Sequence, residues 1–130
     1  MIRCVRIWTG PDGHSLFEEG TIAMPGNQPG DLVSLTERAA SVSFHETAPG
    51  GEFTAHQAPT RQFVLTISGT LQFKTATGAT FEMRAGDALL AEDTLGTGHS
   101  WKLIDNQPWR RAYIVIDVDA NTTALFAKAA

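Results

Sequence analysis

Short stretches of alternating apolar and polar residues, each closed by turn-forming residues, constrain the fold of this chain more than any other feature. In residues 41–47, Val42 and Phe44 alternate with Ser41 and Ser43, which is the two-residue period of a half-buried β-strand. Similar short β-type runs occupy residues 2–9, 52–57, 61–68, 71–75, 80–84, 88–92, 99–104 and 110–118. Long helical patterns are missing between them. Such a series of short strands predicts an all-β sandwich or barrel.

The remaining segments carry weaker signals. Residues 16–22 are expected to form a short strand, and residues 24–31, with two prolines and two glycines, a loop. Residues 32–40 fit either a short helix or a strand. Residues 121–129 contain helix formers behind an Asn or Thr cap, which predicts a short C-terminal helix.

Length and composition limit the function. A chain of 130 residues is expected to form one domain, residues 1–130. The net charge is −4, and Arg110–Arg111 is the only adjacent basic pair, which argues against a nucleic-acid partner. Cys4 is the only cysteine, so neither an intrachain disulfide nor a thiolate zinc site is possible. Together with the lack of an apolar leader or membrane-length run, this leads us to expect a cytoplasmic protein without a membrane partner.

Two histidines and a glutamine are the best candidates for a site. His56 and Gln62 lie on either side of Pro59, which makes a corner, so both can point inward from two adjacent strands. His99 opens a third strand after a glycine-containing loop, residues 93–98. Two imidazoles and one oxygen ligand would leave open positions on a metal ion. From spacing alone, however, ordinary core or surface histidines are the favoured interpretation.

Two segments resemble the motifs of the cupins. The first cupin motif reads Gly, five residues, His, one residue, His, three or four residues, Glu, six residues, Gly; here residues 50–69 supply Gly50, His56, Gln62 and Gly69. Ala58 takes the place of the second His, and Gln62 that of the Glu. In the second motif, residues 86–103, Gly86 matches and the His arrives two residues late as His99. Glu92, Thr94 and Leu103 replace the Pro, Gly and Asn of that motif.

The resemblance implies a jelly-roll β-barrel (double-stranded β-helix), a homodimer, and a divalent metal ion held by His56, Gln62 and His99. The variant HQAPTRQ followed by EDTLGTGH also looks like that of small bacterial single-domain cupins, most of them uncharacterised. The metal would be iron, nickel, manganese or zinc, and the chemistry of the dioxygenase, isomerase or lyase type on a small organic molecule. The alternative is a non-catalytic, ligand-binding or structural cupin whose metal site has degenerated.

Several neighbouring residues carry further expectations. Glu92 and Asp93 flank the proposed site as candidate bases or proton relays, with Glu92 as the most exposed acid nearby, although adjacent loop carboxylates are more often solvated. Arg61 is expected on the face opposite Gln62, with an ion-pair role. Trp101 shares the parity of His99 and lines either the cavity mouth or the core, and His45 is a less favoured ligand. The strand at residues 2–9 is apolar at both parities, so we expect it to be buried against a second subunit or under the terminal helix.

Overall fold

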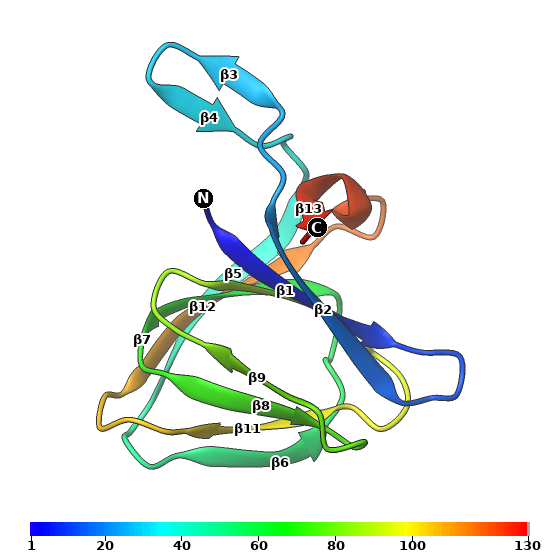
Figure 1. Ribbon diagram of the computed structural model, residues 1–130, viewed down its shortest axis with the longest axis vertical. Helices are drawn as coiled ribbons and strands as arrows, with labels where there is room; N and C mark the ends of the chain where they lie inside the picture. The colour runs from blue at the N-terminus through cyan, green and yellow to red at the C-terminus, as the bar shows by residue number, and fades with distance from the viewer. Residues whose placement is uncertain (130) are drawn as a thin grey trace.

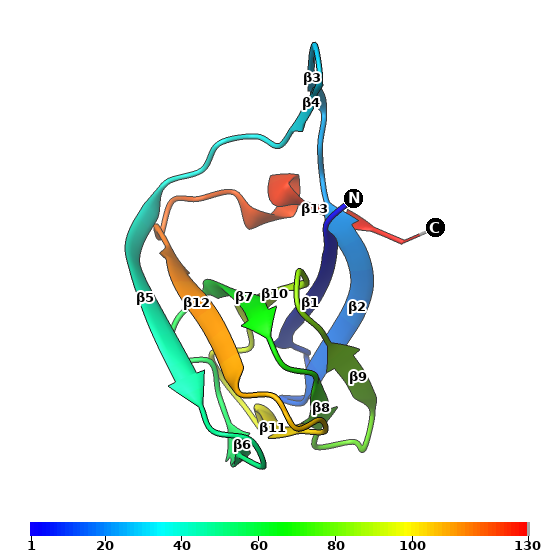
Figure 2. The same ribbon diagram turned by 90° about the vertical axis from the view of Figure 1, so that its left-hand side faces the viewer.

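Two facing β-sheets make up the body of the protein in the computed structural model, which describes residues 1–129 (Figures 1 and 2). The seven-stranded sheet has the order β13-β2-β1-β10-β7-β12-β5, and the four-stranded sheet the order β6-β11-β8-β9. The larger sheet comprises β1 (Arg3–Thr9), β2 (Ser15–Ile22), β5 (Ala39–Thr47), β7 (Gln62–Ser68), β10 (Ala88–Glu92), β12 (Trp109–Ile116) and β13 (Phe126–Lys128). The smaller comprises β6 (Glu52–His56), β8 (Leu71–Thr75), β9 (Thr80–Met83) and β11 (His99–Leu103).

The chain winds between the two sheets. From β5 to β12 it passes from the larger sheet to β6, back to β7, across to β8 and β9, back to β10, across to β11 and back to β12. This is the winding of a double-stranded β-helix, so the all-β prediction is confirmed. The predicted closed barrel is not confirmed, because the strands of the body form two separate hydrogen-bonded sheets. The arrangement is a sandwich and not one continuous sheet.

One predicted loop contains a small hairpin. Within residues 24–33 the chain forms β3 (Gly26–Gln28) and β4 (Asp31–Val33), joined by a turn in which Gly30 has a φ of 84°. Glycine adopts this conformation without the steric cost of a Cβ atom. The hairpin projects from the body of the molecule (Figures 1 and 2). Residues 34–38, expected to be helix or strand, are neither and lead back to β5.

The predicted C-terminal helix is wrong. Only one 3-10 turn, η1 (Thr122–Leu125), forms behind Asn121, whose side chain accepts a hydrogen bond from the Ala124 N–H. The chain then becomes β13, which pairs antiparallel with β2. A Cβ atom on Gly20 would lie 2.1 Å from the Ala127 carbonyl oxygen, so glycine is what permits this close pairing. Hydrogen bonding to a sheet edge has thus overridden the local helix propensity.

Apolar side chains form two cores. The larger lies between the sheets and the smaller on the outer side of the seven-stranded sheet, beside the C-terminal segment. The first includes Val5, Ile7, Val64, Leu71, Phe73, Phe81, Met83, Leu89, Trp101, Leu103 and Trp109, and the second Cys4, Ala88, Leu90, Ile116 and Ala120. Cys4 is the small buried apolar residue that the sequence predicts, and burial raises the pKa of its thiol to about 12.

Strand β1 lies inside the seven-stranded sheet, so the expectation that it is buried against a second subunit or under a terminal helix is wrong. It pairs parallel with β10 on one side and antiparallel with β2 on the other, so it has no free edge. Its two apolar faces fill the two cores, with Val5 and Ile7 on one side and Cys4 on the other. The edges of the seven-stranded sheet are β13 and β5 instead. Within residues 1–129, no helix is of sufficient length and apolarity to cross a membrane.

Candidate functional site

His56 and His99 face each other across neighbouring strands. His56 is the last residue of β6, His99 is the first residue of β11, and the two are direct partners in the antiparallel ladder. Their ring centroids are 4.8 Å apart. This is close enough for both rings to contact one ligand.

A β-bulge aims His56 at the cavity. Trp101 pairs with Phe53 and His99 pairs with His56, so three steps along β6 correspond to two along β11. In a regular strand, residues three apart point to opposite faces, and the extra residue brings Phe53 and His56 to the same side. Gly98, with a φ of 68°, allows the strands to meet here, because a Cβ atom would lie 2.0 Å from the His56 carbonyl oxygen.

Asp93 fixes the orientation of His99. Its Oδ2 atom lies 2.6 Å from Nδ1 of His99 and also accepts a hydrogen bond of 2.9 Å from the Ser15 hydroxyl. Asp93 is fully buried, so the expectation that it is solvated is wrong. A carboxylate can only accept here, so Nδ1 of His99 carries the proton. In the neutral ring, the lone pair is then left on Nε2.

His56 is oriented in the same way by the backbone. Its Nδ1 donates to the Thr54 carbonyl oxygen at 2.9 Å, which again leaves Nε2 available. Burial lowers the pKa of His56, and the nearby His99 acts in the same direction, whereas the Thr54 carbonyl and Asp93 oppose the shift. His56 is therefore neutral at neutral pH, as an imidazole ligand must be.

Gln62 approaches these imidazoles from the other sheet. It begins β7 and is 7% exposed, and its side-chain amide has no hydrogen-bond partner among residues 1–129. Pro59 does make the corner that the sequence predicts, but the corner carries the chain from the four-stranded sheet to the seven-stranded sheet, so His56 and Gln62 lie on facing strands rather than adjacent ones.

The three side chains line one small cavity between the sheets. Its volume is about 30 Å³, which is room for about one or two water-sized groups. Ala58, which stands at the second histidine position of the cupin motif, lines the same cavity, as do Phe73 and Trp101. Trp101, expected either at the cavity mouth or in the core, lines the cavity and also belongs to the core between the sheets.

The donor set can hold an ion, but it has little charge of its own. Among the described residues, no group of three or more His, Cys, Asp or Glu side chains is arranged to hold a metal ion. Two imidazoles and a neutral amide remain, each with a free donor atom on the cavity side. Asp93, in contact with His99, supplies the negative charge that these ligands lack. By donor chemistry alone, the three residues fit a divalent ion, with Asp93 as the charged group behind one of them.

Glu92 lies outside this cavity. On β10, Leu89 and Ala91 point inward, and Glu92 points to the outer face. There it accepts hydrogen bonds from Arg6 at 2.7 Å and from the Thr122 hydroxyl at 2.8 Å. The candidate role of Glu92 as acid or base is therefore not supported by its position. Arg61 also lies on this outer face, as the sequence predicts, with its Nη1 3.7 Å from Oε2 of Glu92. We call Glu92, Arg6, Thr122 and Arg61 the outer-face cluster.

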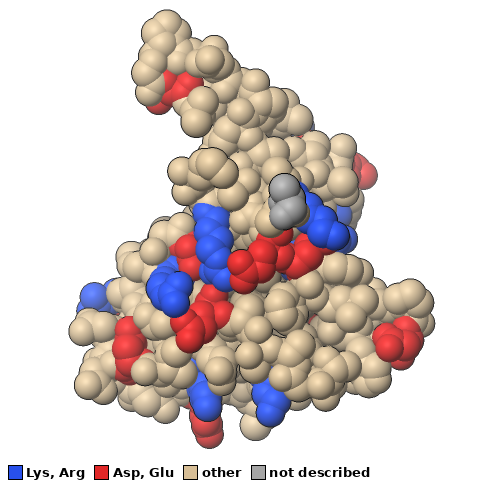
Figure 3. Space-filling view, viewed as in Figure 1, with Lys and Arg blue, Asp and Glu red and all other residues tan. Residues whose placement is uncertain are grey.

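The outer-face cluster belongs to a wider band of paired charges. Arg3 pairs with Glu19 and Asp87, at 2.7 and 2.8 Å, in the same region of β1 and β2. Figure 3 shows basic and acidic side chains interleaved across this face of the molecule. These charges neutralise one another, so the band has the character of a solvated structural surface.

A wider cleft leads outward from the small cavity. It has a volume of about 380 Å³ and shares His56, Gln62, Trp101 and other residues with the cavity. Its walls come from Phe53, from Ser43 and His45 of β5, and from Arg111, Tyr113 and Val115 of β12. His45 lines this outer part only, where it is exposed and packs against Tyr113, so it does not join the other two histidines.

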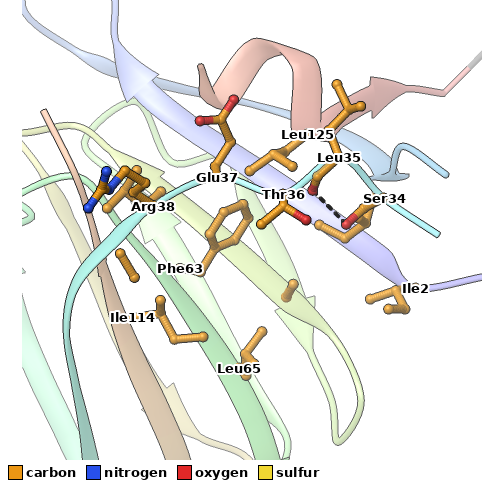
Figure 4. Close-up of a pocket in the computed structure, with 14 residues that line it drawn as sticks. Ile2, Ser34, Leu35, Thr36, Glu37, Arg38, Phe63, Leu65, Ile114 and Leu125 are labelled. Atoms are coloured by element: carbon orange, nitrogen blue, oxygen red, sulfur yellow. Dashed lines mark hydrogen bonds between the residues drawn. The ribbon is translucent and has the colours of Figure 1, made fainter. Parts of the chain in front are cut away.

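A second hollow of similar size lies on the outer face of the seven-stranded sheet (Figure 4). Phe63, Leu65 and Ile114 form its floor, and residues 34–38 run across it. Its lining is mostly apolar and holds neither histidine nor glutamine. The candidate donor side chains therefore line the cavity between the sheets and not this hollow.

The buried positions of Asp93 and Arg111 were missed from the sequence. Asp93 shares the parity of Leu89 and Ala91, so strict alternation through residues 88–93 would have turned it inward. Arg111 shares the parity of Trp109 and Tyr113, and it is 6% exposed. In both cases the two-residue period carries the signal, but charged residues are seldom expected at buried positions.

Two open sheets, their alternating winding and a donor-lined cavity between them define a β-sandwich of the double-stranded β-helix class. Among solved structures, the chain is similar to a DUF861 family protein of Thermotoga maritima, with 20% identity over 57% of this chain and 77% of that one and a TM-score of 0.48. It is similar to a double-stranded beta-helix domain protein of Klebsiella pneumoniae, with 24% identity, coverage of 68% and 73%, and a TM-score of 0.48.

A third similar structure is the cupin domain of a Schizosaccharomyces pombe protein, with 16% identity, coverage of 89% and 83%, and a TM-score of 0.46. No protein-family model matches the sequence, and neither does any protein of curated function. Since each TM-score is below 0.5, the class rests on the strand winding of the chain itself.

Proposed function

We propose that this chain is a small single-domain cupin that binds a divalent metal ion through His56, Gln62 and His99. In the adjoining cleft it binds or acts on a small organic molecule. One observation carries the proposal: both imidazoles have Nδ1 anchored, to Thr54 and to Asp93, so that both Nε2 atoms are left free beside the unbonded amide of Gln62. Ordinary core histidines would be expected to use both nitrogens.

The chemistry follows from the nature of these donors. Three protein ligands leave coordination positions open, and a bound iron, nickel, manganese or zinc ion would polarise an oxygen of the organic molecule. The cupin resemblance favours dioxygenase, isomerase or lyase chemistry. Asp93 would keep Nε2 of His99 directed at the ion, and the apolar wall formed by Phe73 and Trp101 would limit access of water.

The proposal is tested by the metal content of untagged protein. After reconstitution with iron, nickel, manganese or zinc and desalting, elemental analysis should give close to one equivalent of at least one metal. His56→Ala and His99→Gln should lose it. His45→Ala is the matched control, because His45 lines the cleft but not the cavity, and it should keep the metal.

Two results would contradict this proposal. A wild-type protein that retains none of the four metals would favour the alternative, a non-catalytic cupin with a degenerate site. Loss of metal in His45→Ala to the same extent as in His56→Ala would mean that the metal is not held by the proposed ligands. Circular dichroism of each variant separates loss of a ligand from loss of the fold.

The same proposal includes a homodimer. Strand β5 forms one edge of the seven-stranded sheet and spans nine residues, of which Val42 and Phe44 are 60% and 73% exposed. Exposed apolar edges of this kind favour pairing with another chain. A second copy of this protein is the partner that we expect at this edge.

A further inference from the structure

Arg111 is a buried cation on the wall of the cleft. It lies on β12 and is 6% exposed, and its guanidinium carbon sits 3.8 Å from the centre of the Trp109 ring. Trp101 and Tyr113 flank it at 5.8 and 5.6 Å. Stacking on aromatic faces stabilises the charge and fixes the plane of the guanidinium group.

Most of its hydrogen-bond donors are already used. Nη1 donates to the Thr47 hydroxyl at 2.7 Å and to the Trp109 carbonyl oxygen at 3.1 Å, and Nε donates to the Tyr113 hydroxyl at 3.2 Å. Nη2 has no partner among residues 1–129. Nη2 is not among the fully buried side-chain atoms that lack a partner there, which are Nδ1 of His14 and Oδ1 of Asp93. It is therefore accessible, and Arg111 is one of the residues that line the cleft.

The charge of Arg111 is not balanced by the protein. None of the ion pairs formed within residues 1–129 includes it. Arg38, Lys74 and Lys102, the other basic residues outside those pairs, are all exposed. A buried cation without a counter-charge is costly, which makes Arg111 unusual in this chain.

The cleft around Arg111 also lacks acidic side chains. Its lining consists of aromatic, apolar and neutral polar residues together with Arg111 and two histidines. A volume of about 380 Å³ is that of a small-molecule site. The rings of Phe53 and Trp101 stack on one wall with their centroids 6.1 Å apart, and they offer a flat apolar surface. The small cavity lined by His56 and Gln62 lies at the inner end of the cleft.

We propose that the cleft selects small organic anions, with a carboxylate on Nη2 of Arg111 and an apolar or aromatic body against Phe53 and Trp101. The inference rests on the cleft of the proposed function as the ligand site and deepens it by naming the substrate class. It does not require the metal. A phosphate dianion is disfavoured, because its second charge and additional oxygens would find no further Lys or Arg in a cleft where Arg111 has one free guanidinium nitrogen.

The test uses benzoate as the probe, with benzamide as its neutral analogue and phenyl phosphate as the competing anion. Binding is measured by calorimetry in the presence of chelator, so that no metal can hold the anion. Benzoate should bind to the wild-type protein at millimolar concentration or better, and more tightly than either benzamide or phenyl phosphate.

Substitution then locates the charge. Arg111→Met should weaken benzoate binding about 10- to 100-fold and leave benzamide unaffected, since a hydrogen bond to a charged group is lost. Arg110→Met is the matched control, because Arg110 is exposed and pairs with Glu46, and it should change benzoate affinity less than about twofold. If Arg111→Met does not fold, two measurements still test whether a positive charge selects the anion. They are the wild-type comparison of benzoate with benzamide and the same comparison in Tyr113→Phe.

Tyr113→Phe should keep a clear preference for benzoate, because it removes only the hydroxyl that accepts from Nε. The inference is overturned if the wild type binds benzamide as well as benzoate, if it prefers phenyl phosphate, or if it binds none of the probes up to about 50 mM. If the protein binds no metal but still binds benzoate through Arg111, only the metal proposal is contradicted. If the protein binds metal through His56 and His99 but does not prefer benzoate, only the inference about organic anions is contradicted.

Discussion

Asp93 connects the interior of the β-sandwich to the candidate metal site. Its carboxylate orients His99, contacts the Ser15 hydroxyl, and leaves Oδ1 buried without a partner within residues 1–129. Keeping a carboxylate in this position costs stability, because a buried acceptor has been left unpaired. Such a cost is expected where a residue serves a ligand rather than the fold.

Replacement of Asp93 by Asn should separate these two roles. The amide keeps the shape but removes the negative charge beside His99, so affinity for a divalent ion should fall about 10- to 100-fold. Metal titration followed by calorimetry measures this. Ser15→Ala, which keeps the charge and loses only one hydrogen bond, is the control. An unchanged metal affinity in Asp93→Asn would contradict the role assigned to Asp93.

Gln62 gives a test in which two interpretations predict opposite signs. Gln62→Glu adds a negative charge to the ligand set, so a divalent ion should bind more tightly and raise the melting temperature. In a metal-free pocket the same carboxylate is buried without a partner and should destabilise the fold by several kcal/mol at neutral pH unless it takes up a proton. Thermal melts with and without chelator compare the two. A fall in melting temperature that chelator leaves unaltered would rule out metal binding.

At the scale of the element, the bulge in β6 decides where His56 points. Gly98 permits it, since a Cβ atom at this position would lie 2.0 Å from the His56 carbonyl oxygen at a φ of 68°. Gly98→Ala should therefore push β6 away from β11. We expect a loss of about 3 kcal/mol or more in the free energy of unfolding, and loss of metal in whatever fraction remains folded.

Gly78→Ala is the matched control for this prediction. Gly78 also has a positive φ, of 90°, but no atom lies within 4 Å of its would-be Cβ. It should cost only about 1–2 kcal/mol, from the backbone conformation alone. Urea denaturation gives both values, and equal costs for the two substitutions would mean that the contact with His56 is unimportant.

The elements that the sequence predicted correctly are those whose signal is local. Alternation along a strand needs no partner to be recognised, so the long strands and the loop at residues 93–98 were found. The short strands β3, β4 and β13 depend on pairing: β13 exists because β2 offers an edge and Gly20 leaves room for it. No pattern inside residues 121–129 reveals that edge, and helix propensity pointed the wrong way.

In the candidate site, too, the local features were predicted and those that depend on the packing of the sheets were not. His56, Gln62 and His99 were brought together by the cupin motifs, and the structure places all three on one cavity. Their strands were predicted, but the crossing between sheets was not, so Gln62 was expected beside His56 rather than opposite it. Glu92 and Asp93 were treated alike as solvated carboxylates, with Glu92 preferred as the more exposed acid, whereas parity along β10 separates the two and turns Asp93 toward His99.

At the scale of the whole molecule, the edge formed by β5 is where association is expected. Nine residues in extended conformation span about 30 Å, and the alternate residues Val42 and Phe44 expose apolar side chains beside it. Two copies related by a twofold axis could pair their β5 edges antiparallel, which is the self-complementary geometry of most dimers. The inner face of β5 carries Ser43 and His45, so the pairing would also hold one wall of the cleft in place.

We therefore expect sedimentation of the wild type at micromolar concentration to give the mass of a dimer. Phe44→Glu should shift it to a monomer, because a charge at the edge must be desolvated for the strands to pair. Leu32→Glu is the control: Leu32 is similarly exposed, at 64%, but lies on β4 in the projecting hairpin, and its substitution should leave the dimer intact. A monomeric wild type would refute the dimer outright. Dissociation by Leu32→Glu with Phe44→Glu still dimeric would move the interface from β5 to the hairpin.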